Sequence, residues 1–195
     1  MRGLVLWMAV LPLVAADLPV AQCTAGPPEA VVIVVRHADR DGELLNEKGW
    51  ERARVLRDLV LDRFGRVDAA VVTTIERTLQ TVTPLLEAVK ERGGEVAVRR
   101  YDPHDYEAAA RAIEEARRRS RQRPAVIVYA GHSDTVRPIL DRLAPEQVRK
   151  HAAEWFPCGG GICHSDYDNV WAITYCPGAP PAASRSEFGR PTPAH

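Results

Sequence analysis

Two runs of apolar residues, each followed within two positions by a histidine, constrain the fold of this chain most. The run Val31-Val32-Ile33-Val34-Val35 is β-branched throughout, which is typical of a strand buried on both faces in the interior of a parallel sheet. A second run, Ala125–Ala130, is also apolar. Ligands bind outside the carboxyl ends of strands in open α/β sheets, so Arg36-His37 and Gly131-His132 are candidates for chemistry. The alternative for Arg36-His37 is a charged loop in solvent.

Strand and helix patterns alternate between residues 30 and 176. Asn46 is a candidate N-cap, Gly65 a candidate helix end, and Pro84 is expected to kink its helix or leave its first turns irregular. Helices are predicted over residues 47–64, 76–92, 106–121, 135–143 and 145–155, and further strands over residues 69–73, 95–99 and 170–175. The strand at 95–99 is more polar than the others and suits a sheet edge. This alternation predicts an α/β fold, a three-layer sandwich whose mostly parallel sheet carries helices on both faces.

The two ends of the chain differ from this middle region. Residues 1–16 resemble an export signal, because Arg2 precedes an apolar segment and small residues offer a cleavage site before Asp17. The apolar segment is short for a retained anchor, so we expect cleavage and no stable membrane insertion afterwards. Residues 17–29 contain three prolines and form a leader, residues 30–176 form the domain, and residues 177–195 are predicted to be a disordered tail. An exported protein, periplasmic or secreted, is expected.

Charge and cysteine content narrow the possible partners. The 26 basic and 26 acidic residues balance, so bulk charge gives no reason to expect a nucleic-acid partner. An even number of cysteines in an exported protein favours disulfides, and we expect Cys158 to pair with Cys163 and Cys23 with Cys176. The alternative is a metal site formed by Cys158, Cys163, His164 and Cys176, which the irregular spacing and an oxidising compartment disfavour.

A third strand adds a further basic residue to the two histidines. The run at residues 69–73 is followed within a few residues by Arg77. If the three strands lie side by side, Arg36, His37, Arg77 and His132 converge at one edge of the sheet. A helix that starts at residues 133–135 would add an N-terminus, which favours anions. Two guanidinium groups, two imidazoles and a helix dipole suit a phosphoryl group.

Four segments carry a resemblance to a known family. They are Arg36-His37-Ala38-Asp39, Leu45-Asn46-Glu47-Lys48-Gly49, Thr73-Thr74-Ile75-Glu76-Arg77-Thr78-Leu79-Gln80-Thr81 and Gly131-His132-Ser133-Asp134-Thr135. In order and spacing these resemble the Arg-His-Gly (or Arg-His-Ala), Leu-Thr-Glu-Lys-Gly, Ser-Pro-x-x-Arg-Thr-x-Gln-Thr and Gly-His-Ser-Asn-Thr segments of the histidine phosphatase superfamily, also called phosphoglycerate-mutase-like. The resemblance covers about residues 30–176.

The resemblance implies a phosphatase that works through a covalent phosphohistidine. By position His37 would be the nucleophile, and Arg36, Arg77 and His132 would hold the phosphoryl oxygens and stabilise the transition state. A neutral imidazole is a competent nucleophile near physiological pH. The arginines would fill the electrostatic role of a metal ion, so no metal and no cofactor is expected.

The general acid of such a reaction is harder to assign. Mutase-type members place a Glu after the second Arg segment, and acid-phosphatase-type members place an Asp directly after the second His. Here Ser133 occupies that place, with Asp134 one residue further on. Asp102 is the first candidate acid and Asp105 the second, although a simple helix cap explains Asp105 equally well. Asp39 is a further candidate, with positioning of Arg36 or of a nearby backbone group as the favoured role.

The sequence therefore predicts a metal-independent phosphomonoester hydrolase acting on a phosphorylated small molecule. Two alternatives stay open. One is a non-catalytic module that binds or senses phosphate with a retained pocket, and the other is a small-metabolite phosphomutase. Chain length disfavours the mutase, because little sequence is left for a lid that encloses the substrate. Basic residues expected near the rim of the pocket would suit an anionic ester: Arg40, Arg99, Arg100 and Arg137.

Overall fold

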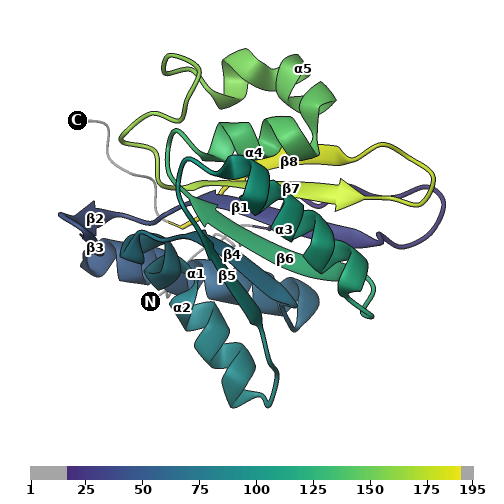
Figure 1. The fold of residues 1–195 in the computed structure, drawn as a ribbon, viewed down its shortest axis with the longest axis horizontal. Helices are drawn as coiled ribbons and strands as arrows, with labels where there is room; N and C mark the ends of the chain where they lie inside the picture. The colour runs from purple at the N-terminus through teal and green to yellow at the C-terminus, as the bar shows by residue number, and fades with distance from the viewer. Residues whose placement is uncertain (1–16, 190–195) are drawn as a thin grey trace, which may run out of the picture.

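A six-stranded sheet forms the centre of the molecule in the computed structural model, which describes residues 17–189 (Figure 1). The strand order is β5-β4-β6-β1-β7-β8. The pairs β5–β4, β4–β6 and β6–β1 are parallel, and β1–β7 and β7–β8 are antiparallel. The strands are β1 (Ala30–Arg36), β4 (Ala69–Thr73), β5 (Ala97–Tyr101), β6 (Ala125–Gly131), β7 (Asn169–Tyr175) and β8 (Ala182–Glu187).

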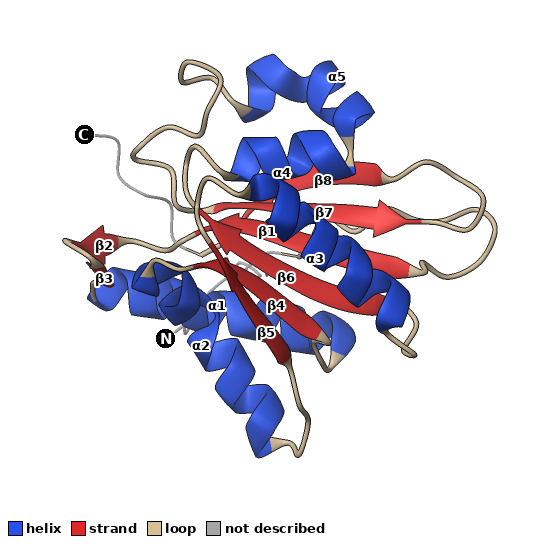
Figure 2. Cartoon of the chain, in the orientation of Figure 1, coloured by secondary structure: helices blue, strands red, loops and turns tan. Residues whose placement is uncertain are grey.

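Helices cover both faces of the sheet (Figure 2). One face carries α1 (Glu47–Phe64) and α2 (Glu76–Glu91), and the other carries α3 (Tyr106–Arg119), α4 (Val136–Leu143) and α5 (Pro145–Trp155). The predicted three-layer α/β architecture is therefore confirmed. The helix boundaries agree with the sequence to within about two residues, and α2 continues through Pro84 from end to end.

The central strand β1 shows why the apolar run requires this architecture. Its residues are buried along the whole strand, and they alternate between the two faces. Val32 and Val34 pack into the cluster formed with α3, α4 and α5, whereas Val31, Ile33 and Val35 pack into the cluster formed with α1 and α2. Full burial of a side chain of this size contributes roughly 1.5–3 kcal/mol. A strand with one solvated face would forfeit about half of that burial.

The predicted caps set the ends of the helices. The side chain of Asn46 accepts a hydrogen bond from the backbone N–H of Gly49 at 2.9 Å, and Gly65 ends α1 with a φ of 70°. Asp105 accepts from the N–H of Ala108 at 3.0 Å and caps α3. Gly49 also permits a close approach, because a Cβ atom there would lie 2.0 Å from the backbone oxygen of Asp39.

The prediction of a disordered tail from residue 177 is wrong for residues 182–187. These residues form β8, which pairs with β7, and Phe188 beyond it is buried in the cluster that contains α1. The segment is rich in Ala and Ser, so its local strand preference is weak, and pairing with β7 determines its conformation. Residues 190–195 and the predicted signal at residues 1–16 lie outside the described residues.

The leader packs against the domain. Leu18 is buried, and the N–H of Ala21 donates to the hydroxyl of Thr174 at 3.0 Å. A disulfide joins Cys23 to Cys176, which confirms the predicted pairing. Between residues 17 and 189, no helix has the length and apolar character needed to cross a membrane.

The segment between β1 and α1 contains a short hairpin of β2 (Arg40–Asp41) and β3 (Leu44–Leu45). The edge strand β5 begins two residues later than predicted, because its pairing with β4 sets Tyr101 opposite Thr73. Its position at the edge of the sheet is as predicted.

Candidate active site

Three adjacent parallel strands bring the predicted site residues to one edge of the sheet. His37 follows β1, His132 follows β6, and Arg77 lies in the first turn of the helix that follows β4. Together with Arg36 they line a single cavity of about 470 Å³. The other residues that line it are Arg40, Ile75, Pro103, His104, Ser133, Asp134, Cys158, Ile162 and His164.

His37 is oriented by the backbone around it. Its N–H donates to the carbonyl of Gly131 at 2.8 Å, which extends the ladder between β1 and β6. Its Nδ1 lies 2.8 Å from the carbonyl oxygen of Ala38. A carbonyl only accepts, so Nδ1 carries the proton, and in the neutral ring Nε2 keeps its lone pair. His37 is thus held in the tautomer in which Nε2 can act as a nucleophile.

Burial and neighbouring cations keep both histidines of the cavity neutral. Burial lowers the pKa of His37 to about 3, helped by the charges of Arg36 and Arg77. Burial likewise lowers the pKa of His132 to about 4, helped by Arg77. The two rings meet edge to face with centroids 5.2 Å apart. At neutral pH the cavity therefore contains two uncharged imidazoles between two guanidinium groups.

Arg36 is fixed by a loop that is distant in sequence. Its Nη1 donates to the carbonyls of Cys163, His164 and Asp166 at 3.0, 3.0 and 3.1 Å, and its guanidinium lies 4.0 Å from the centre of the Tyr167 ring. Burial lowers the pKa of Arg36. Its Nε is buried and has no hydrogen-bond partner. The Nη1 end of the guanidinium group is thus held by the loop, while its Nε donor has no acceptor.

Arg77 has the same kind of free donor. Its Nη1 forms an ion pair with Glu43 Oε2 at 3.3 Å, on the hairpin of β2 and β3, and its Nε is buried without a partner. Buried guanidinium donors without acceptors are costly and uncommon, so each of them needs an explanation. Two of them at one cavity indicate a place for an anion.

His132 is held on both sides by threonines. Its Nε2 lies 2.9 Å from Oγ1 of Thr73 at the end of β4, and its backbone N–H donates to Oγ1 of Thr135 at 2.7 Å. The hydroxyl of Tyr129 donates to the same Thr135 oxygen at 3.1 Å. Gly131 is needed between them, since a Cβ atom there would lie 2.4 Å from Thr135 Oγ1.

Two further side chains of α2 support the site, although no role was predicted for them from the sequence. Oγ1 of Thr81 accepts from the N–H of Ala38, directly after His37, at 2.9 Å. Oε1 of Gln80 accepts from the N–H of Leu45 at 2.8 Å and fixes β3. Their sequence signal was present, because both lie within the segment that carries Arg77. Within this segment Arg77 lines the cavity, Gln80 fixes β3, and Thr81 fixes the backbone directly after the candidate nucleophile.

The candidate acids lie in different places. Asp102 is exposed, its Oδ1 accepts from the N–H of His104 at 2.9 Å, and it does not line the cavity. Asp105 is the helix cap already described. Asp39 is buried and forms an ion pair with Arg52 at 2.7 Å, so it fixes α1 rather than Arg36. Asp134 does line the cavity.

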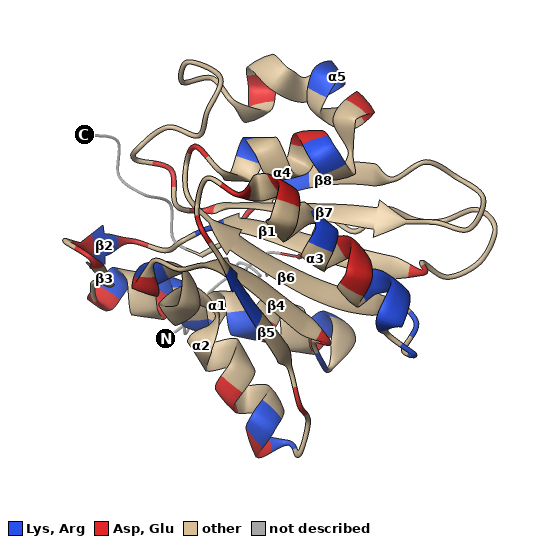
Figure 3. Cartoon of the chain, viewed as in Figure 1, with Lys and Arg blue, Asp and Glu red and all other residues tan. Residues whose placement is uncertain are grey.

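Among the four basic residues expected near the rim, the structure places Arg40 at the cavity. Arg99 and Arg100 lie on the edge strand β5 (Figure 3), where Arg100 bonds to Glu76 and Arg99 lines a different groove, against α3. Arg137 donates to the carbonyl of Gly160 at 2.6 Å.

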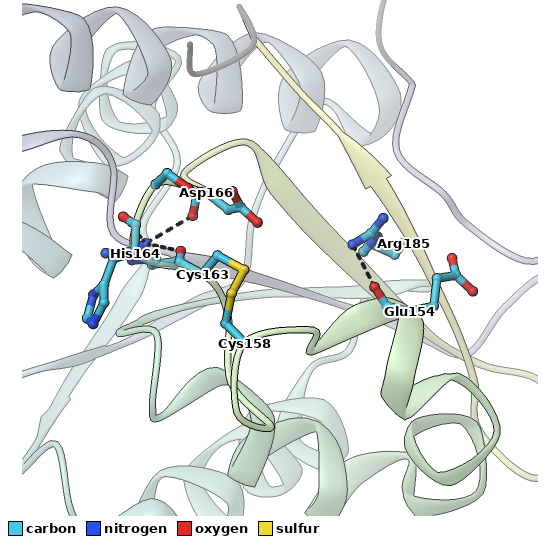
Figure 4. Close-up of a disulfide and its surroundings, with 8 residues drawn as sticks. Glu154, Cys158, Cys163, His164, Asp166 and Arg185 are labelled. Carbon is cyan, nitrogen blue, oxygen red and sulfur yellow. Dashed lines mark hydrogen bonds between the residues drawn. A yellow bond between two sulfur atoms is a disulfide. The ribbon is translucent and has the colours of Figure 1, made fainter. Parts of the chain in front are cut away.

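The second disulfide lies at the start of the segment that holds Arg36. Cys158 and Cys163 are bonded as predicted (Figure 4). Cys158, Ile162 and His164, within or directly after the disulfide loop, line the cavity. With Cys176 also in a disulfide, all three cysteines of the alternative metal site are used, so the alternative is wrong.

Solved structures with this fold include phosphatases and a mutase. The protein histidine phosphatase SixA, solved with tungstate, is 12% identical, with coverage of 80% of this chain and 96% of that one and a TM-score of 0.56. Phosphoserine phosphatase from Entamoeba histolytica, solved with 3-phosphoglyceric acid, is 10% identical, with coverage of 83% and 97% and a TM-score of 0.51. Phosphoglycerate mutase from Plasmodium falciparum is 14% identical, with coverage of 85% and 94% and a TM-score of 0.52.

No protein-family model and no curated protein sequence matches the chain. At such low identities the structural likeness establishes the fold, and it is the phosphoglycerate-mutase-like fold that the sequence resemblance predicts.

Proposed function

We propose that this chain is a metal-independent phosphomonoester hydrolase that forms a phosphohistidine on His37. One observation carries the proposal. His37 is buried and neutral, its Nδ1 is bonded to the Ala38 carbonyl, and it lines a cavity with two guanidinium groups whose Nε donors lack acceptors. This arrangement combines a nucleophile with a receptor for an anion, which is what transfer of a phosphoryl group requires.

The reaction would proceed in two steps. Nε2 of His37 attacks phosphorus, the P–N bond forms, the P–O ester bond breaks, and the leaving oxygen takes up a proton. A water molecule then attacks phosphorus, the P–N bond breaks, inorganic phosphate leaves, and the neutral imidazole is restored. The fixed Nδ1 contact keeps His37 in one tautomer through both steps. Two easier steps thus replace one difficult displacement.

Arg36, Arg77 and His132 are proposed to bind the phosphoryl oxygens. Arg36 and Arg77 would use their guanidinium groups, whose buried Nε donors have no other acceptor, and His132 would donate from the nitrogen that does not face Thr73. Donors that are already oriented before the reaction typically contribute about 10²–10³ in rate each. The structures with similar folds support this chemistry, since two are named phosphatases and one of these was solved with tungstate, a tetrahedral oxyanion.

The proposed substrate is a phosphorylated small molecule, and the proposed location is outside the cytoplasm. Two disulfides support the location outside the cytoplasm, because disulfides persist in oxidising compartments. Arg40 at the cavity supports an anionic substrate.

Hydrolysis of 4-nitrophenyl phosphate by the chain spanning residues 17–195 tests the proposal. We expect turnover without added metal, its loss in His37→Ala, and a ³¹P signal of phosphohistidine in denatured, rapidly quenched protein. His151→Ala is the matched control, because His151 lies on the surface of α5 beside Glu154. Full activity in His37→Ala would show that another group is the nucleophile.

A non-catalytic phosphate-binding module is the second candidate. Two observations favour it: Ser133 stands directly after His132, and Asp102 does not line the cavity. Tight binding of inorganic phosphate without turnover of any phosphoester would support this alternative.

A further inference from the structure

The cavity contains one carboxylate among the described residues that line it, and this is Asp134. The other ionisable side chains around it are basic or imidazole groups. Asp134 is exposed to solvent at the mouth, two residues after His132 in the sequence. A reaction that expels an alkoxide from phosphorus needs a proton at this place.

The backbone around Asp134 is fixed on both sides. The N–H groups of Thr135 and Val136 donate to the carbonyl of His132 at 3.2 and 3.1 Å, and these bonds close the turn that leads into α4. The carbonyl of Ser133 accepts from the N–H of Ile162 at 3.3 Å, which joins the turn to the disulfide loop. Asp134 therefore projects from a turn whose position relative to His132 is set by the fold.

The charge of Asp134 acts on His132. Its negative charge raises the pKa of that imidazole and so opposes part of the effect of burial. Asp134 and His132, the proposed ligand of a phosphoryl oxygen, line the same cavity, so Asp134 faces the space in which a phosphoryl group would bind.

Neighbouring carboxylates are already engaged in other contacts. Glu43 is paired with Arg77, Asp39 with Arg52, and Asp166 accepts from the hydroxyl of Ser165. Asp102 and Asp105 accept from backbone N–H groups. Across residues 17–189 no hydrogen bond or ion pair holds the carboxylate of Asp134. It is free to exchange a proton with a bound molecule.

We propose that Asp134 is the proton donor for the leaving oxygen, a role that rests on the phosphatase activity proposed above. In the first step the P–O bond breaks, its electron pair goes to the leaving oxygen, and the proton of the Asp134 carboxyl group passes to that oxygen. In the second step the carboxylate accepts a proton from the water that attacks the phosphohistidine. The carboxyl group is then restored for the next turnover.

The test uses the basicity of the leaving group. A 4-nitrophenolate leaves without protonation, whereas an alkoxide does not, and general acid catalysis typically contributes about 10²–10⁴. We therefore expect Asp134→Asn to lower kcat/KM by about 10²–10⁴-fold on an alkyl phosphate such as glycerol phosphate, with phenyl phosphate intermediate. The loss on 4-nitrophenyl phosphate should stay below roughly tenfold, because little protonation is needed there. The ratio kcat/KM is used because it reports the first chemical step.

Three variants make the result specific. Asp141→Asn on α4 is the matched control, since Asp141 lies outside the cavity and is paired with Arg137. Asp134→Glu keeps a carboxyl group and should recover part of the activity on alkyl phosphates. Asp102→Asn examines the other candidate acid and should not change the dependence on the leaving group.

The outcomes separate this inference from the proposed function. If wild-type protein hydrolyses all three esters and Asp134→Asn loses activity on them equally, Asp134 is not the acid, although the chain is a phosphatase. A leaving-group dependence in Asp102→Asn, His104→Gln or His164→Gln, with none in Asp134→Asn, would assign the proton to that residue instead. A wild-type chain that hydrolyses none of them would overturn the proposed function, and this inference with it.

Discussion

Oγ1 of Thr73, the last residue of β4, lies 2.9 Å from Nε2 of His132, which follows the neighbouring strand β6. The contact joins two segments that are 59 residues apart. When the hydroxyl donates to Nε2, the neutral ring must carry its proton on Nδ1. Thr73 can therefore decide which nitrogen of His132 offers a proton to a phosphoryl oxygen.

Thr73→Val should weaken the site while the fold is kept. Removing one such hydrogen bond costs about 1.4 kcal/mol, which corresponds to about a tenfold loss in kcat/KM. Thr73→Ser retains the hydroxyl and should retain most of the activity. Thermal unfolding of both variants provides the control, because Thr73 also contacts Thr78. Equal activity of the Val and wild-type proteins would remove Thr73 from the proposed site.

The depressed pKa values of His37 and His132 predict a fall in stability on mild acidification. The pKa values are about 3 and about 4 in the folded chain, against 6.5 in an unfolded one. Between these limits the unfolded chain binds protons that the folded chain does not, so the free energy of unfolding decreases as pH falls from about 6.5 toward 3. From pH 7 to pH 5 the loss should be on the order of 1–2 kcal/mol per imidazole.

Urea unfolding at pH 7 and pH 5, without phosphate, measures this effect. His37→Gln should reduce the difference between the two pH values, and His151→Gln, at the surface, should not. If the free energy of unfolding of the wild-type chain is the same at both values, the imidazoles titrate normally and are not held neutral by the cavity.

The convergence of the four basic side chains could be predicted because parallel strands end at a common edge. The apolar run of β1 and the segment with Arg77 are local signals, and the β4-β6-β1 order places their ends together. Strand β8 could not be predicted in this way. Its residues Ala182–Glu187 have little strand preference, and only pairing with β7 determines their conformation.

The acid shows a second limit of sequence reasoning. Asp102 and Asp134 are both acidic residues in loops that follow strands, and spacing along the chain does not tell which side chain lines a cavity. Asp102 is turned into a local contact with the N–H of His104, whereas Asp134 lines the cavity. The contacts of Thr73 and Thr81 were hidden for a similar reason. A threonine that supports a site has the same sequence signal as one that only packs.

The unpaired donors of Arg36 and Arg77 predict that inorganic phosphate binds and stabilises the folded chain. A ligand that binds only the folded state raises its stability by RT ln(1 + [L]/Kd), which is about 2.7 kcal/mol at 100 times Kd. The shift in thermal unfolding with phosphate should be much smaller in Arg77→Gln. An equal shift in Arg77→Gln would place the anion elsewhere.

Glu43 should oppose this binding. Its carboxylate lies 3.3 Å from Nη1 of Arg77, so it competes with an anion for that guanidinium. Glu43 is 83% exposed in its side chain, and exposed pairs contribute only about 0–1 kcal/mol. Glu43→Gln should therefore raise phosphate affinity by no more than about fivefold. Isothermal titration of both proteins checks this, and weaker phosphate binding in the variant would show that Glu43 supports Arg77.

The two disulfides should have separable effects. Cys23–Cys176 joins residues 153 positions apart and ties the leader to the end of β7. Cys158–Cys163 closes a loop that ends at Cys163, whose carbonyl holds Arg36 together with two carbonyls just beyond the loop. Removing a disulfide from a small exported domain typically costs 2–5 kcal/mol, with longer closed loops at the upper end in the chain-entropy account. The double variant Cys23→Ser/Cys176→Ser should therefore lose more stability than Cys158→Ser/Cys163→Ser.

Activity should follow the opposite order, because only the second pair fixes an arginine of the cavity. We expect about a tenfold loss in kcat/KM for Cys158→Ser/Cys163→Ser, equivalent to about 1.4 kcal/mol of contacts to Arg36, and less than a twofold loss for the other pair at a temperature where both are folded. Urea unfolding measures the stability of both double variants, and steady-state kinetics on the same preparations measures their kcat/KM. Equal activity losses in the two variants would show that the loop holds Arg36 without its disulfide.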